Sequence, residues 1–201
     1  MHKRKYKKYK DYIDHQKEKT QRRPLRKKLL KKWPERRQKF LDRFKCLEKY
    51  NIVSGKVLCL AARMGCEVKV LRELGFDAVG IDLVAAPPLV EEGDFHNLRF
   101  GDNSFDLVFS NSIDHVHPER VLDFVSEIRR VLKPNGHVLF DVTFGSFGNY
   151  ESLRIDSVEE LIKQFDGFSL IHKHNYNQKN VTKKHSLSTI FHHEILLRLE
   201  K

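Results

Sequence analysis

From residue 51 onward, short apolar runs alternate with amphipathic stretches. Four of these runs are mostly apolar, as in strands buried on both faces: 56–60, 77–82, 105–110 and 137–142. Three stretches carry apolar side chains at helical spacing: 66–75, 118–132 and 157–166. Two further strands, expected to pair antiparallel, are predicted over 168–174 and 188–199. This alternation predicts an α/β domain whose mostly parallel sheet is covered by helices on both faces.

The first 50 residues follow a different pattern. Two stretches place apolar side chains at helical spacing between lysines and arginines: Tyr6, Tyr9, Tyr12 and Ile13, then Leu25, Leu29, Leu30 and Trp33. Pro24 and Pro34 divide them, because proline lacks an amide proton. A helix over about 35–49 is expected to dock on the main domain through one stripe: Phe40, Phe44 and Leu47. We therefore divide the chain into a basic arm, residues 1–34, and a domain, residues 35–201.

The positive charge is confined to the N-terminal quarter. Residues 1–50 hold 21 lysines and arginines against six acidic residues, whereas the rest of the chain holds 17 against 21. Such asymmetry predicts that residues 1–33 bind a polyanion, most often RNA or DNA and less often an anionic lipid surface. The alternative is a solvated, partly disordered tail.

Length and composition limit the remaining classes. A chain of 201 residues supports one core, and it contains no apolar run of about 18 residues that could span a membrane. The charged N-terminus does not resemble a secretory signal, so we expect a cytoplasmic protein, or a nuclear one in a eukaryotic cell. Three cysteines without a C-x-x-C pair predict neither a disulfide framework nor a zinc knuckle. No metal site is predicted, because no carboxylate or cysteine accompanies the four C-terminal histidines at ligand spacing: His172, His174, His192 and His193.

The order of motifs carries a resemblance. A strand, a turn, a helix and a strand ending in Gly-Ile-Asp82 are followed by Gly-Asp-Phe95, FDLVFSN over 105–111 and RVLKPNG over 130–136. This order, over about residues 55–143, resembles the class I S-adenosylmethionine-dependent methyltransferases, most closely the type 11 kind. The resemblance implies a Rossmann-like, seven-stranded sheet of order 3-2-1-4-5-7-6, S-adenosylmethionine as cofactor and methyl transfer as the reaction.

The first loop departs from the pattern of that family, which normally reads D-x-G-x-G-x-G. Ala61 and Gly65 keep the loop small, but Cys59 replaces the acid and Arg63 the middle glycine. Arginine does not take a positive φ without strain, so we expect either a different loop conformation or weakened cofactor binding. Arg63 could bind the carboxylate of the cofactor, held in place by Glu67, or could form a simple surface pair with Glu67.

The resemblance places the nucleoside at the second strand. Asp82 at its end can accept hydrogen bonds from both ribose hydroxyls, and Leu83 would pack against adenine. Asp94 and Phe95 correspond to the pair that contacts the adenine amine and a ring nitrogen. The alternatives are an ordinary strand-end aspartate for Asp82 and a turn former for Asp94.

The segment that follows the fourth strand is expected near the transferred methyl group. Asn111 could hold the methionine moiety, while Asp114 and His115 could orient an acceptor or take its proton. Many methyltransferases need only in-line positioning, and a loop histidine can be purely structural.

Two functions from different classes remain open. The first is a methyltransferase acting on a nucleic acid or a ribonucleoprotein that the basic arm binds, although the absence of an N-P-P-Y-type tetrad disfavours exocyclic base amines. The second is a binding module that kept the fold and lost the reaction, which the departures at Cys59 and Arg63 favour.

Overall fold

The computed structural model describes residues 8–144, 153, 155–177 and 191–200. Tyr6 and the first residues of the strand predicted over 188–199 lie outside these ranges. One sheet has the order β3-β2-β1-β4-β5-β7-β6, which confirms the predicted topology. Its strands are β1 (Lys56–Leu60), β2 (Asp77–Asp82), β3 (Val90–Glu92), β4 (Phe105–Ser110), β5 (Leu132–Thr143), β6 (Phe168–Asn177) and β7 (Phe191–Leu199).

The pairing is parallel from β3 to β5, and β7 is antiparallel to both β5 and β6. The mostly apolar runs form the centre of the sheet because their side chains are buried on both faces: Val57, Leu58, Leu107 and Val108 are fully buried. The predicted mixed sheet, with a C-terminal antiparallel pair, is therefore confirmed.

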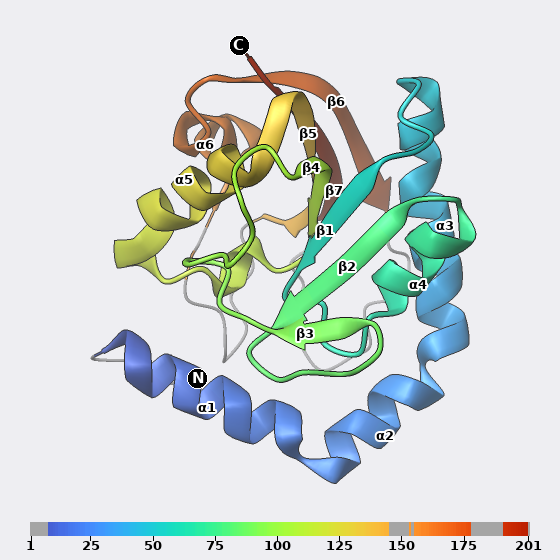
Figure 1. Ribbon diagram of the computed structural model, residues 1–201, viewed down its shortest axis with the longest axis vertical. Helices are drawn as coiled ribbons and strands as arrows, with labels where there is room; N and C mark the ends of the chain where they lie inside the picture. Colours follow the sequence, from blue (N-terminus) through green and yellow to red (C-terminus); the bar gives the residue numbers. More distant parts are fainter. Residues whose placement is uncertain (1–7, 145–152, 154, 178–190, 201) are drawn as a thin grey trace.

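Helices cover both faces, as predicted (Figure 1). One face packs against α5 (Val121–Val131) and α6 (Val158–Gln164), and the other against α3 (Trp33–Lys49) and α4 (Cys66–Glu73). A 3-10 turn, Pro118–Arg120, precedes α5 in place of the first turn of the predicted helix. The segment Pro134–Gly136 lies inside β5 and not in a turn between elements; β5 shifts register against β4 there, and Asn135 takes a φ of 62°.

The N-terminal helices are α1 (Tyr9–Gln21), α2 (Arg23–Lys31) and α3. Pro24 and Pro34 lie in the first turns of α2 and α3, where the missing amide proton has no intrahelical acceptor to lose. The predicted stripe of α3 docks on the sheet: Phe40 and Phe44 are each 1% exposed and meet Phe109 of β4 edge-on, with centroids 5.8 and 5.0 Å away.

Helices α1 and α2 run past the ends of β1 and β2 at which the strand arrows point (Figure 1). Tyr12 of α1 is 3% exposed and Gln16 is 9% exposed. For α1 the interpretation as a solvated tail is therefore wrong, because its buried side packs on the domain, whereas α2 has no buried residue. None of the described helices is long and apolar enough to span a membrane.

Candidate functional site

A pocket opens at the carboxyl edge of the parallel strands, where open α/β sheets bind ligands. It encloses about 700 Å³ of empty space, part of it open to solvent. Its floor contains six of the eight residues predicted to bind a cofactor: Ala61, Arg63, Asp82, Leu83, Asp94 and Phe95. Gly65 and Asn111 do not line it. Six of the predicted residues therefore meet in one pocket at the predicted edge of the sheet.

The first loop keeps a left-handed backbone at all three small positions of the family pattern. Ala61, Arg63 and Gly65 have φ values of 54°, 51° and 75°. Of the two predicted outcomes, a different loop conformation is therefore wrong, because Arg63 takes a positive φ at a cost of about 1–2 kcal/mol; weakened cofactor binding stays a prediction. One stabilising contact is the backbone N–H of Arg63, which donates to Oδ2 of Asp82 over 3.0 Å. A side chain at position 65 would meet Leu89 Cβ at 2.6 Å, so glycine is needed there.

Cys59 and Glu67, the other two residues discussed for the first loop, are both buried. Cys59 is fully buried in β1 and packs in the core under α3 and α4. Glu67 is 1% exposed, which contradicts the surface pair with Arg63. Burial raises the pKa of Glu67 to about 7, although the charges of Arg36 and Arg63 oppose this. Its position follows from α4, whose first turn faces the sheet.

Asp82 occupies the end of β2 with 9% of its surface exposed. One oxygen accepts the N–H of Arg63 and the other accepts the N–H of Val84 over 3.2 Å. Burial raises the pKa of this carboxyl, and the two amides act against that shift. A carboxylate has about four acceptor sites, so Asp82 keeps acceptor capacity for a ligand in the pocket.

Asp94 is already bonded to the N-terminal arm. Tyr9 Oη lies 2.9 Å from each of its carboxylate oxygens, and the backbone N–H of His96 donates to Oδ1 over 2.9 Å. Burial opposes ionisation, yet the hydrogen bonds from His96 and Tyr9 hold the pKa of Asp94 below its ordinary value. Burial and the Asp94 carboxylate raise the pKa of Tyr9, so its phenol remains a donor.

The two predicted catalytic residues, Asp114 and His115, lie in the loop after β4, and only His115 lines the pocket. Ile113–His115 forms a 3-10 turn, and His115 lines the pocket together with Ser112. Asp114 is not part of the lining, and its backbone carbonyl accepts the N–H of Leu153. Asn111, which also lies outside the lining, accepts the Ser112 hydroxyl over 3.0 Å.

Sequence reasoning missed the roof of the pocket. It is built by α1 and α2: Tyr9, Tyr12, Gln16, Lys19, Thr20, Leu25 and Leu29. The Nε2 atom of Gln16 is buried and has no hydrogen-bond partner among the described residues, which leaves a donor available to a ligand. The helical spacing of Tyr9, Tyr12 and Leu25, Leu29 was the available signal, since a purely solvated helix needs no such stripe.

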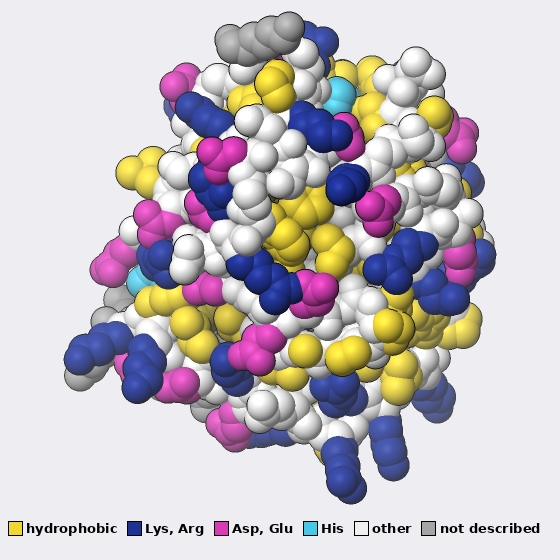
Figure 2. Space-filling view, in the orientation of Figure 1, with side chains coloured by type: hydrophobic (Ala, Val, Ile, Leu, Met, Phe, Trp, Pro, Cys, Tyr) yellow, Lys and Arg dark blue, Asp and Glu magenta, His cyan; other side chains and the backbone are white. Residues whose placement is uncertain are grey.

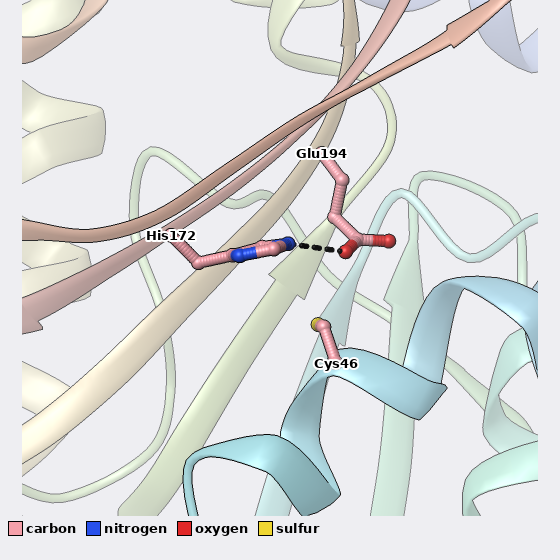
Figure 3. A group of neighbouring side chains, drawn as sticks. All are labelled: Cys46, His172 and Glu194. Carbon is pink, nitrogen blue, oxygen red and sulfur yellow. Dashed lines mark hydrogen bonds and ion pairs between the residues drawn. The ribbon is translucent and has the colours of Figure 1, made fainter.

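No metal site was predicted, because no cysteine or carboxylate stands at ligand spacing from the C-terminal histidines along the sequence. The fold brings both from distant segments beside one of the histidines: Cys46, His172 and Glu194 (Figure 3).

Comparison with known proteins relates part of the chain to a protein family. The model of a family described as "Methyltransferase domain" matches residues 58–140. No curated protein sequence gives a significant match. A solved 1,6-didemethyltoxoflavin-N1-methyltransferase of Burkholderia thailandensis is 17% identical with a TM-score of 0.65, covering 93% of this chain and 90% of that one.

Two further structures share the fold. A SAM-dependent methyltransferase of Methanosarcina mazei is 16% identical, with a TM-score of 0.61 and 77% and 97% of the two chains covered. The [4+2]-cyclase SpnF is 15% identical, with a TM-score of 0.61 and 80% of each chain covered. Residues 58–140 thus match the methyltransferase domain family, and the chain as a whole has the fold of the class I S-adenosylmethionine-dependent methyltransferases.

Proposed function

We propose that this chain binds S-adenosylmethionine and transfers its methyl group to a small-molecule acceptor. The observation that carries the proposal is the pocket itself, which unites the Asp82 carboxylate, the Asp94–Phe95 pair and the Ala61–Arg63 loop at the carboxyl edge. The sulfonium of the cofactor supplies an activated methyl group, so the protein contributes mainly orientation and exclusion of water.

Five residues of the lining have chemical counterparts in such a ligand or its acceptor. The remaining acceptor capacity of Asp82 suits ribose hydroxyls. The side chain of Phe95 offers an apolar face for a planar base, and the guanidinium of Arg63 offers charge to a carboxylate. Gln16 adds a buried donor from the roof. His115, also in the lining, could accept a proton from a hydroxyl or amine acceptor.

The roof favours a small acceptor over a macromolecule. Helices α1 and α2 close the pocket on the side opposite the sheet, so an acceptor has to enter beside them. The B. thailandensis structure aligns over 93% of this chain, more than residues 35–201 could supply alone, so part of the arm has a counterpart there. That structure is described with 1,6-didemethyltoxoflavin and S-adenosylhomocysteine bound.

Calorimetric titration with S-adenosylmethionine tests the proposal. Asp82→Ala should weaken binding by about 1.5–3 kcal/mol, roughly 10- to 150-fold, because charged hydrogen bonds are lost. Asp77→Ala, which changes an exposed aspartate at the opposite end of β2, is the matched control and should bind like the wild type. An unchanged dissociation constant for Asp82→Ala would refute the assignment of the ribose site.

A binding module without methyl transfer is the competing function. The [4+2]-cyclase SpnF shows that a protein described by another reaction has this fold. A folded chain that gives no heat with millimolar S-adenosylmethionine would favour the module over the enzyme. Mass spectrometry of ligand retained by the native protein distinguishes the two independently.

The basic surface of α2 supports a second, separate activity: binding of RNA or another polyanion. Six basic side chains between residues 22 and 32 are exposed: Arg22, Arg23, Lys27, Lys28, Lys31 and Lys32. Figure 2 shows lysine and arginine side chains projecting along the lower margin of the molecule. Changing Lys27, Lys28 and Lys31 to glutamine should make single-stranded RNA binding less sensitive to salt. The slope of the logarithm of the binding constant against the logarithm of the salt concentration should become shallower by about 0.7 for each phosphate that the variant no longer neutralises. Lys45→Gln on α3 is the control. A flat salt dependence of the intact chain would remove the idea.

A further inference from the structure

Three side chains of different elements converge on one point away from the lining of the pocket. Cys46 belongs to α3, His172 to β6 and Glu194 to β7. One potential ligand atom from each lies within 4.8 Å of the other two. Figure 3 shows the imidazole and the carboxylate directed toward each other, with the Cys46 sulfur on the side of α3. A sulfur, a nitrogen and an oxygen in this arrangement form a set of ligands typical of Zn²⁺.

The scaffold holds these atoms in place before any ion binds. The aromatic stripe docks α3 on the sheet, and the antiparallel register sets Glu194 of β7 opposite His174 of β6, two residues from His172. Cys46 is 8% exposed, Glu194 is 2% exposed and the His172 side chain is 14% exposed. A preformed, nearly buried site loses little conformational entropy when it binds an ion.

A second layer of hydrogen bonds orients two of the three ligands. Tyr50 Oη lies 3.1 Å from Nδ1 of His172, which leaves Nε2 directed toward Glu194 at 3.0 Å. Tyr176 donates its hydroxyl to Oε2 of Glu194 over 2.8 Å, so Oε1 is the oxygen that faces the imidazole. Protein metal sites use such outer partners to fix the ring orientation of a ligating histidine and the carboxylate beside it.

The local charge favours a cation. Among the described residues, Glu194 has no lysine or arginine within ion-pair distance, although it is almost fully buried. The nearby cations of α3 are engaged elsewhere, since Lys39 and Arg43 pair with Asp141 over 2.9 and 3.4 Å. A buried carboxylate without a strong counter-charge carries a desolvation penalty of several kcal/mol. A divalent ion would offset that penalty.

We propose that Cys46 Sγ, His172 Nε2 and Glu194 Oε1 bind one Zn²⁺ ion, with water as the fourth ligand. On binding, the thiol releases its proton to solvent, sulfur–zinc, nitrogen–zinc and oxygen–zinc bonds form, and no oxidation state changes. The ion ties the C-terminal half of α3 to the β6–β7 pair. The mixture of thiolate, imidazole and carboxylate favours zinc over magnesium or calcium, which prefer oxygen ligands alone.

Cobalt substitution tests this directly in the full chain without a histidine tag. After treatment with a chelator, wild-type protein titrated with Co²⁺ should develop a sulfur-to-cobalt charge-transfer band and tetrahedral visible bands that saturate at one ion per chain. Zn²⁺ should abolish both by displacement. Cys46→Ser should lose the charge-transfer band, and Tyr50→Phe should weaken Zn²⁺ binding about 10- to 100-fold.

Two matched controls use neighbouring residues of the same type. Cys66→Ser changes a buried cysteine at the start of α4, and His174→Gln changes an exposed histidine whose ring stacks on that of His172. Both should retain the wild-type spectrum. A folded wild type without the charge-transfer band overturns the proposal, as does a band that persists in Cys46→Ser. The wild-type measurement remains decisive even where a variant fails to fold.

Discussion

The buried carboxyl of Glu67 gives a quantitative prediction about pH. Its folded-state pKa is about 7, against roughly 4.3 in an unfolded chain. Between these values the folded state binds more protons than the unfolded state, so the contribution of Glu67 to stability falls as the pH rises from about 4 to 7. At 1.36 kcal/mol per pKa unit, the carboxylate lowers the free energy of unfolding by about 3–4 kcal/mol above pH 7.

Glu67→Gln isolates this effect because glutamine has nearly the same shape and cannot ionise. The neighbouring charges are those of Arg36 and Arg63, which favour the carboxylate, and Asp82, which disfavours it. The difference in unfolding free energy between variant and wild type should rise from near zero at pH 4 to about 3–4 kcal/mol in favour of the variant at pH 8. Urea denaturation across this range, followed by circular dichroism, measures the difference while the titrations of other groups cancel.

Glu73→Gln is the matched control on the same helix. There the hydrogen bond from Arg37 lowers the pKa of Glu73, so the variant should lose stability at neutral pH. A Glu67→Gln difference that does not change with pH, or a variant less stable than wild type at pH 8, would refute the role given to burial.

Three further predictions test the packing, each by chemical denaturation. Phe40→Ala should lower the free energy of unfolding by about 3–5 kcal/mol, because its ring is buried between α3 and β4. Asp141→Asn should cost about 3–5 kcal/mol at pH 7, since buried Arg43 loses its partner, and the difference should shrink below about pH 4. Gly65→Ala should destabilise more than Gly75→Ala; both have positive φ, but only position 65 meets close neighbours. Equal effects at the two glycines would contradict the importance of those neighbours.

The fold was accessible from the sequence for a physical reason. Strands buried on both faces need nearly continuous apolar side chains, and the helices between them need one apolar face. The hydrophobic pattern therefore predicts the order of strands and helices. The strand-end position of Asp82 is equally local, because a carboxylate that follows a buried strand has to emerge at the edge of the sheet. These features depend on neighbours in the chain.

The remaining features depend on contacts between segments far apart in the chain, and only the tertiary structure decided them. Nothing local indicates that Tyr9 bonds Asp94, 85 positions away, and so turns the basic arm into the roof of the pocket. No pattern of neighbouring residues indicates that Glu67 faces the core. None indicates that Cys46 of α3 lies beside His172 and Glu194 of the β6–β7 pair. Hydrophobic periodicity determines which face of an element is buried, whereas the partner of each polar group follows from how the elements pack together.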